Sequence, residues 1–221
     1  MNKKFTAVIF DLDGVITDTA EYHYLAWKQL GEELGITFDR EFNETLKGVS
    51  RMDSLERILQ LGNSQYDFTL AEKEALAKKK NDHYVNLIKD ITPADLLPGI
   101  QDLLQDLKVN GYKIGMASAS KNAFTVINAL GVQSYFDHIV DAANVKNSKP
   151  DPEVFLKSAT ALEVNPESCV GVEDAAAGVT AINKAQMFSI AIGNDPGLNH
   201  AQIVLPSTKE LTLNVIEKLA N

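Results

Sequence analysis

The sequence contains a single cysteine, so no disulfide can form within the chain. It has 21 basic residues against 30 acidic ones, a net charge of −9, which argues against a protein that binds nucleic-acid phosphates in general. No apolar run approaches the ~20 residues that a membrane-spanning helix needs, and residues 1–5 lack the apolar core of a signal peptide. We therefore predict a cytoplasmic protein without nucleic-acid or membrane partners. Cys169 lies in an apolar stretch and is expected to be a small buried residue, not a nucleophile.

Short apolar runs alternate with helical periodicity along most of the chain. The first run, at residues 7–10, is typical of a strand buried on both faces. Further strands are expected at 112–117, 138–140, 168–172, 188–192 and 203–205, and helices at 100–109, 123–130, 152–162, 175–184 and 211–219. Strands that alternate with helices predict a parallel sheet with crossover connections. The predicted fold class is therefore α/β, a doubly wound, Rossmann-like core.

The segment after the first strand has a different pattern, which is helical and contains no convincing strand. One helix is expected to begin at a capping box formed by Asp18 and Glu21 and to end near Gly35. Two more helices are expected at 52–61 and 70–88, the second opened by a capping box at Thr69 and Glu72. We therefore predict an α/β core of residues 1–16 and 93–221, interrupted by a helical-bundle domain of residues 17–92.

Two carboxylates, Asp11 and Asp13, follow the first predicted strand, and Gly14 allows the chain to turn away. Open α/β sheets bind ligands beyond the carboxyl ends of their strands. Two like charges this close are costly unless a cation offsets them, and Mg²⁺ does so with carboxylates and a substrate phosphate. The stretch alone also allows a simple Asp-Gly turn.

Three further polar clusters follow later in the chain, and each has two interpretations. Residues 118–122 offer hydroxyls and a lysine to a phosphate, or form a helix cap beside a solvated lysine. Lys149 is fixed in direction by Pro150 and could offset phosphoryl charge, or it is a surface lysine. Glu173 and Asp174 could ligate Mg²⁺, or Asp174 caps a helix with Glu173 beside it.

Together, in this order, these four clusters resemble the motifs of the haloacid dehalogenase superfamily of phosphoryl-transfer enzymes, over essentially the whole chain. Segments 18–27, 46–51, 78–82 and 118–122 are similar to the β-glucose phosphomutases of that superfamily. The resemblance implies interconversion of β-D-glucose 1-phosphate and glucose 6-phosphate through an aspartyl-phosphate enzyme. It also implies Mg²⁺ as cofactor, β-glucose 1,6-bisphosphate as intermediate, sugar phosphates as the small-molecule partners, a monomer, and a cap formed by the helical insert.

The resemblance also implies a role for individual residues. Asp11 would be the phosphorylated nucleophile and Asp13 the general acid/base, assisted by Thr19 and His23. The metal ligands would be Asp11, Asp13 (through its backbone carbonyl), Glu173 and Asp174. The substrate and its phosphates would be bound by Gly48, Val49, Ser50, Arg51, Ser54, Lys80, Ser118, Ala119, Ser120, Lys121, Asn122 and Lys149. Arg51 would hold the phosphate that does not react, because a guanidinium binds phosphate with two parallel hydrogen bonds. Considered without the resemblance, Arg51 could also be an exposed arginine at the start of a helix. Lys80 could also be a solvent-exposed lysine on a helix.

Two other functions remain open. A sugar-phosphate phosphatase of the same superfamily would share the nucleophile and the metal ligands, so only the cap and the 120–122 segment favour a mutase. A non-catalytic phosphosugar-binding protein would have no need for Asp11 and Asp13, and both are present. A dinucleotide-binding dehydrogenase is disfavoured because the glycine fingerprint after the first strand is missing.

Overall fold

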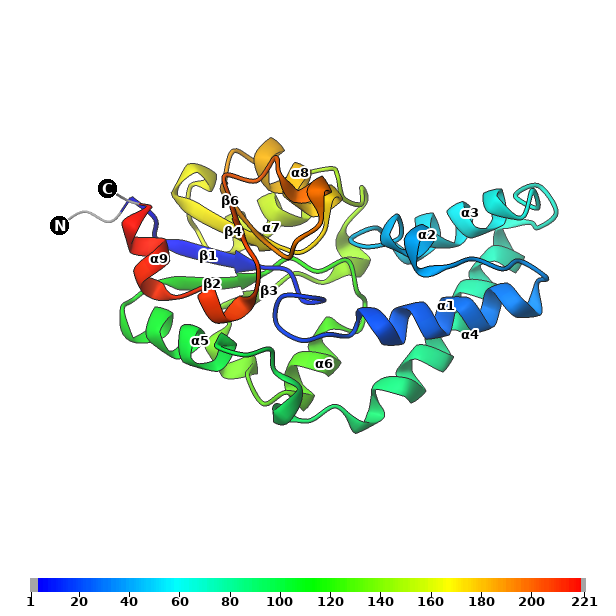
Figure 1. The fold of residues 1–221 in the computed structure, drawn as a ribbon, viewed down its shortest axis with the longest axis horizontal. Helices are drawn as coiled ribbons and strands as arrows, with labels where there is room; N and C mark the ends of the chain where they lie inside the picture. The colour runs from blue at the N-terminus through cyan, green and yellow to red at the C-terminus, as the bar shows by residue number, and fades with distance from the viewer. Residues whose placement is uncertain (1–3, 220–221) are drawn as a thin grey trace.

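The computed structural model describes residues 4–219, and the fold has the predicted α/β class. Residues 1–3 and 220–221, which the predicted core includes, lie outside this range. The six strands are β1 (Ala7–Phe10), β2 (Lys113–Met116), β3 (His138–Ile139), β4 (Cys169–Glu173), β5 (Phe188–Ile192) and β6 (Ile203–Leu205). They pair in parallel in the order β3-β2-β1-β4-β5-β6, so β1 lies at the centre (Figure 1).

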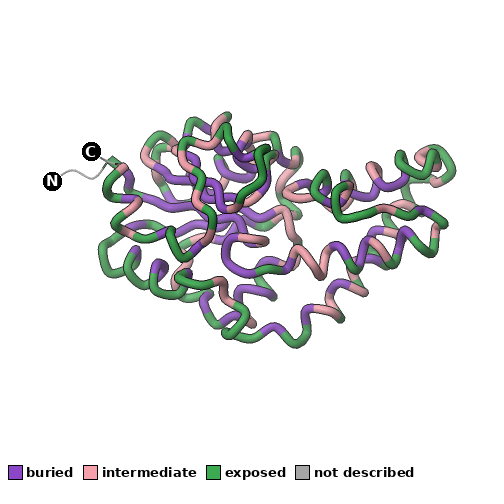
Figure 2. Tube along the Cα trace, in the orientation of Figure 1, coloured by how far each residue is buried: buried purple, intermediate pink, exposed green. Residues whose placement is uncertain are grey.

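The central strand shows why the sheet is covered on both faces. All four residues of β1 are buried, and alternate side chains enter two different hydrophobic clusters. Val8 and Phe10 pack with residues of α5 (Ile100–Val109), α6 (Ala123–Ala129) and α9 (Leu213–Lys218). Ala7 and Ile9 pack on the opposite face with α7 (Glu153–Ala161) and α8 (Ala176–Lys184). Because strand side chains alternate, a continuous apolar run suits this doubly covered position. Figure 2 shows buried residues concentrated in this region.

The chain between β1 and α5 forms a helical bundle beyond the carboxyl ends of the strands (Figure 1). Its helices are α1 (Ala20–Glu33), α2 (Arg40–Glu44), α3 (Arg51–Leu61) and α4 (Leu70–Leu87). They have their own hydrophobic cluster, which includes Trp27, Leu55 and Ile58. The two connections to the core lie together, since Leu97 N–H donates to Ile16 O at 2.9 Å. The exact domain boundaries at 16/17 and 92/93 stay a prediction.

Several local expectations can be compared with the structure. The capping box at Thr69 and Glu72 is confirmed, and Cys169 is buried, with its pKa raised to about 12 by burial. The capping box at Asp18 is wrong: α1 begins one residue later, with Thr19 as its N-cap and no side-chain cap bond. The short helix α2 was not predicted, because five residues are too few for a clear period. Among the described residues, no helix is long and apolar enough to cross a membrane.

Candidate active site

The sheet order brings four distant segments of the chain to one place. β1 lies between β2 and β4, so the residues that follow these strands meet at the same edge of the sheet. The Asp11 N–H donates to Val172 O at 2.9 Å, which ties the end of β1 to the end of β4. Asp11 is only 5% exposed, and its Oδ2 accepts from the Asp13 N–H at 3.0 Å. The Asp11 carboxylate is therefore held in a defined direction.

Lys149 lies at the centre of this cluster. Its Nζ donates to Asp11 Oδ1 and to Glu173 Oε1, both at 2.5 Å, and the residue is 2% exposed. Burial opposes the charge of the ammonium, but the carboxylates of Asp11 and Glu173 outweigh it and raise the pKa of Lys149 above its ordinary value. The interpretation of Lys149 as a surface lysine is therefore wrong. A buried charge of this kind persists only when it is paired.

The carboxylates of Asp11, Glu173 and Asp174 could together hold a metal ion. One oxygen from each lies within 4.8 Å of the others, and hard oxygen ligands suit Mg²⁺. Burial, with the neighbouring Glu173, raises the pKa of Asp174 well above its ordinary value, so a bound cation would relieve an unfavourable charge. Lys47 Nζ, 3.7 Å from Asp174 Oδ2, supplies part of this compensation. The structure contradicts the interpretation of Asp174 as a helix cap, since Ala175 is the N-cap of α8.

Glu173 has less freedom than the other two carboxylates. Its Oε1 accepts from Lys149, and its Oε2 accepts from the N–H groups of Asp174 and Ala175, each at 3.0 Å. Gly178 leaves room for this side chain, because a Cβ there would lie 1.8 Å from Glu173 Oε1. A Cβ at Gly14, whose φ is +73°, would likewise lie 2.2 Å from Asp174 Oδ2. These glycines allow both carboxylates to reach the end of β1.

Asp13 has one side-chain oxygen free to meet a ligand. Its Oδ1 is buried and has no hydrogen-bond partner among the described residues. Burial, with a contribution from the nearby Asp11 charge, raises the pKa of Asp13 to about 8. On the other side, Asp13 Oδ2 lies 3.9 Å from His23 Nε2. The carboxyl group can therefore exist in both protonation states near neutral pH.

Buried Lys80 and half-buried His23, both from the helical bundle, lie next to Asp13. Lys80 Nζ lies 2.7 Å from His23 Nδ1 and above the rings of Trp27 and Tyr84, at 4.6 and 5.0 Å from their centroids. Burial lowers the pKa of Lys80 well below its usual range, and the charge of Arg51 adds to this effect. The pKa of His23 is also lowered, by burial and by Lys80. Lys80 is only 3% exposed, so its interpretation as a solvated lysine is wrong.

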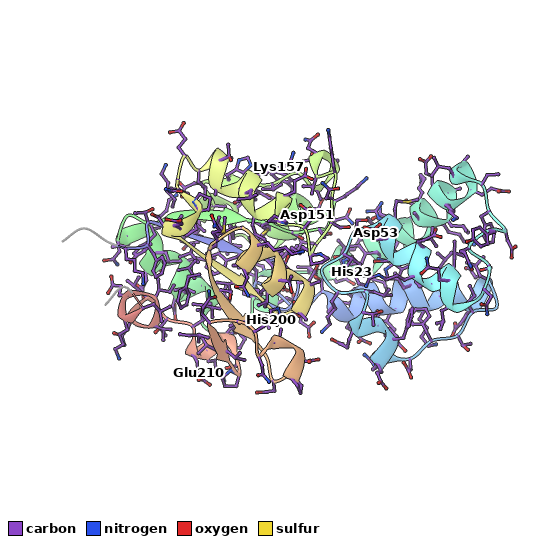
Figure 3. All side chains as sticks on the ribbon, turned by 90° about the horizontal axis from the view of Figure 1, so that it is seen from above. His23, Asp53, Asp151, Lys157, His200 and Glu210 are labelled. Carbon is purple, nitrogen blue, oxygen red and sulfur yellow. The ribbon has the colours of Figure 1, made fainter. Side chains whose placement is uncertain are left out.

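Three contacts connect the helical bundle to the core around the site. Asn81 Oδ1, in α4, accepts from Asn122 Nδ2 at 2.8 Å, and Lys47 Nζ approaches Asp174. The Ser148 hydroxyl donates to Asp53 Oδ2, in α3. Figure 3 shows Asp53 and His23 at the boundary between the bundle and the core. The bundle therefore lies closed over the carboxyl end of the sheet.

A cavity lies between the bundle and the core, and most of the predicted residues line it. Its predicted members are Asp11, Asp13, His23, Gly48, Val49, Arg51, Ser54, Lys80, Ala119, Ser120, Lys121 and Asp174. Ser118, Lys149 and Ser50 line an adjoining cavity that also reaches Arg51 and Lys121. Thr19, Asn122 and Glu173 line neither cavity, although Asn122 and Glu173 contact residues that do.

Four residues that had no predicted role also lie at the site. Lys47 and Trp27 line the cavity, Tyr84 stacks on His23 with centroids 4.0 Å apart, and Asn81 contacts Arg51. Trp27, Lys47 and Asn81 lie in the segments 18–27, 46–51 and 78–82, whose resemblance to phosphomutases was the sequence signal that could have pointed to them. Tyr84 is four residues after Lys80, on the same face of a helix.

The fold and the carboxylate and lysine cluster are those of a phosphoryl-transfer enzyme with an α/β core. Residues 5–186 match the haloacid dehalogenase-like hydrolase family. The chain belongs to this family. It is 48% identical over 212 residues to the β-phosphoglucomutase of Bacillus subtilis, covering 96% of this chain and 94% of that protein. It is 28% identical to a phosphorylated carbohydrates phosphatase of Thermotoga maritima, covering 96% and 99%. A crystal structure of β-phosphoglucomutase from Clostridium difficile has 54% identity and a TM-score of 0.95, covering 97% and 96%.

Proposed function

We propose that this protein is a phosphomutase that interconverts β-D-glucose 1-phosphate and glucose 6-phosphate. The observation that carries the proposal is its similarity, over nearly the full length of both chains, to two β-phosphoglucomutases at 48% and 54% identity. The closed helical bundle supports the same conclusion, because a mutase must keep water away from its phosphorylated intermediate.

In this mechanism an Asp11 oxygen attacks a phosphorus of β-glucose 1,6-bisphosphate, and the bond from that phosphorus to the sugar oxygen breaks. Asp13 gives its proton to the departing sugar oxygen. In the return step, the 6-hydroxyl of β-glucose 1-phosphate attacks the aspartyl phosphate and loses its proton to Asp13. The bisphosphate formed then turns round, so that its 1-phosphate is transferred to Asp11 and glucose 6-phosphate is released. The unpartnered Oδ1 of Asp13 supports this role.

Positive charge around Asp11 would stabilise the transferring phosphoryl group. We assign this role to Lys149, with the Ser118 hydroxyl beside it, and the role of holding Lys149 in place to Glu173. Asp11, Asp174 and the backbone carbonyl of Asp13 would hold Mg²⁺. When bound, the ion supplies charge that offsets both the carboxylates and the phosphoryl oxygens.

The bundle would provide the remaining contacts. Arg51 would hold the non-reacting phosphate together with Ser120, Lys121 and Asn122. The loop of Gly48, Val49 and Ser50, with Ser54, would shape the sugar site. Thr19 would keep Asp13 in place at the start of α1, and His23 with Lys80 would connect bundle closure to Asp13. A bound sugar phosphate would then contact the bundle and the core together.

The second candidate is a sugar-phosphate phosphatase, which the 28% identical phosphatase favours. The two are separated by incubating the purified protein with Mg²⁺, β-glucose 1-phosphate and a trace of β-glucose 1,6-bisphosphate. We expect glucose 6-phosphate to accumulate far faster than free phosphate. Release of phosphate in step with substrate loss would identify a phosphatase, and neither product would indicate a non-catalytic phosphosugar-binding protein.

The remaining parts of the proposal are the cytoplasmic location, the monomeric state and β-glucose 1,6-bisphosphate as activator. The low content of basic residues, 21 against 30 acidic ones, supports a protein without nucleic-acid partners. Light scattering of the purified protein tests the monomer. Dependence of the initial rate on added bisphosphate tests the activator.

A further inference from the structure

Asn81 joins three segments of the chain through a single oxygen atom. Its Oδ1 accepts from Arg51 Nη2 at 2.7 Å and from Asn122 Nδ2 at 2.8 Å. Arg51 begins α3 and Asn81 lies within α4, both in the bundle, whereas Asn122 stands in the core at the N-cap of α6. The two donors are 71 residues apart in the sequence but are held within reach of one acceptor.

Neither donor is used up by this contact. A guanidinium has five N–H groups in a fixed plane, and an amide NH₂ has two. Each therefore gives one N–H to Asn81 and keeps at least one more for another acceptor. Because Asn81 restrains one N–H of each donor, the directions of the remaining N–H groups are also restrained.

We propose that Asn81 is a positioning residue for the phosphate of the substrate that does not react. It holds a donor of the bundle and a donor of the core in one arrangement, so that the pair binds a phosphate at a fixed distance from Asp11. This inference rests on the proposed function, which places Arg51 and Asn122 at that phosphate. Arg51 lines the cavity, and Asn122 directly follows the lining residue Lys121 in the chain, whereas Asn81 does not line the cavity. Asn81 therefore acts through these two donors and not by contact with the substrate.

The amide of Asn81 suits this role better than a carboxylate would. A carboxylate would accept the same two hydrogen bonds and would bind the guanidinium more strongly. It would also place a negative charge beside the doubly charged phosphate and cancel the charge of Arg51. A neutral acceptor orients the donors and leaves the positive charge available to the substrate.

The test compares Asn81→Ala, Asn81→Asp and the wild type, with Asn86→Ala as a control on an exposed position of the same helix. The kcat and KM for β-glucose 1-phosphate are measured at a fixed concentration of bisphosphate. Hydrolysis of acetyl phosphate, which has no second phosphate, is measured in parallel. Thermal unfolding of each variant reports on folding.

We expect Asn81→Ala to lower kcat/KM for the sugar phosphate about tenfold or more, mainly through KM, while acetyl phosphate hydrolysis stays within about twofold. Asn81→Asp keeps the acceptor, so kcat should stay near that of the wild type while KM rises about tenfold. If the alanine variant unfolds, the aspartate variant carries the test. An unchanged KM in a folded variant, or an equal loss with acetyl phosphate, would overturn the inference. A wild type that releases only phosphate would instead refute the proposed mutase function.

Discussion

Replacing Lys149 by methionine tests whether the centre of the site is held together by charge. Methionine has a similar length and volume but no ammonium group. The ammonium lies 2.5 Å from both Asp11 Oδ1 and Glu173 Oε1, and its side chain is 1% exposed. The variant would therefore leave two carboxylates buried without their cation.

The expected loss of stability follows from this geometry. Removing one partner of a buried ion pair costs about 3–5 kcal/mol, because the remaining charge stays buried and uncompensated. For a chain of this size the loss corresponds to a fall in Tm of roughly 6–20 °C. Lys157→Met is the matched control, because Lys157 is 42% exposed and pairs with Glu153 at the surface, where a pair contributes less than about 1 kcal/mol.

The loss should also depend on pH. Burial already raises the pKa of Glu173, and removing Lys149 raises it further. A carboxyl group with a raised pKa in the folded state destabilises the protein as pH rises above its ordinary pKa of 4.5. The raised pKa of Lys149 itself means that its stabilising charge is fully present below 10.5, so it adds no pH dependence to the wild type between pH 5.5 and 8.

Urea unfolding at pH 5.5 and at pH 8, without divalent cations, measures these effects. The variant should lose more free energy of unfolding at pH 8 than at pH 5.5. At the lower pH, protons can neutralise the buried carboxylates that have lost the Lys149 ammonium group. A loss of less than about 1 kcal/mol, or an equal loss at both pH values, would refute the reasoning.

Three further predictions concern activity. Asp11→Asn removes the nucleophilic carboxylate and should lower formation of glucose 6-phosphate at least about 1,000-fold; substantial remaining activity would exclude Asp11 as nucleophile. Arg51→Ala should lower mutase kcat/KM about tenfold or more and leave hydrolysis of acetyl phosphate within about twofold, since only the sugar substrate has a second phosphate; equal losses would contradict the assignment. Chelation by EDTA should abolish turnover and excess Mg²⁺ should restore it, whereas full activity in EDTA would exclude a metal-dependent site.

Much of the core could be predicted from the sequence, because local chemistry decides it. The run 7–10 is apolar throughout, which is typical of a parallel strand that is covered on both faces. The capping box of Thr69 and Glu72 depends on residues three positions apart. Asp18 and Thr19 are both suitable caps by residue type, so the sequence could not decide between them, and the structure has Thr19 at the cap position.

The order of the motifs along the chain predicted most of the residues that line the cavity, but not how they interact. Lys149 lies 138 residues from Asp11 and 24 from Glu173, and no local signal shows that it is buried between them. The same holds for Lys80 beside His23 and for Asn81 between Arg51 and Asn122. Strands are decided largely by neighbouring residues, whereas burial and long-range pairing are decided by the strand order and by the bundle that packs over the sheet. The sequence alone therefore indicated most of the elements and the candidate reacting groups, and only the tertiary structure decided which charges meet.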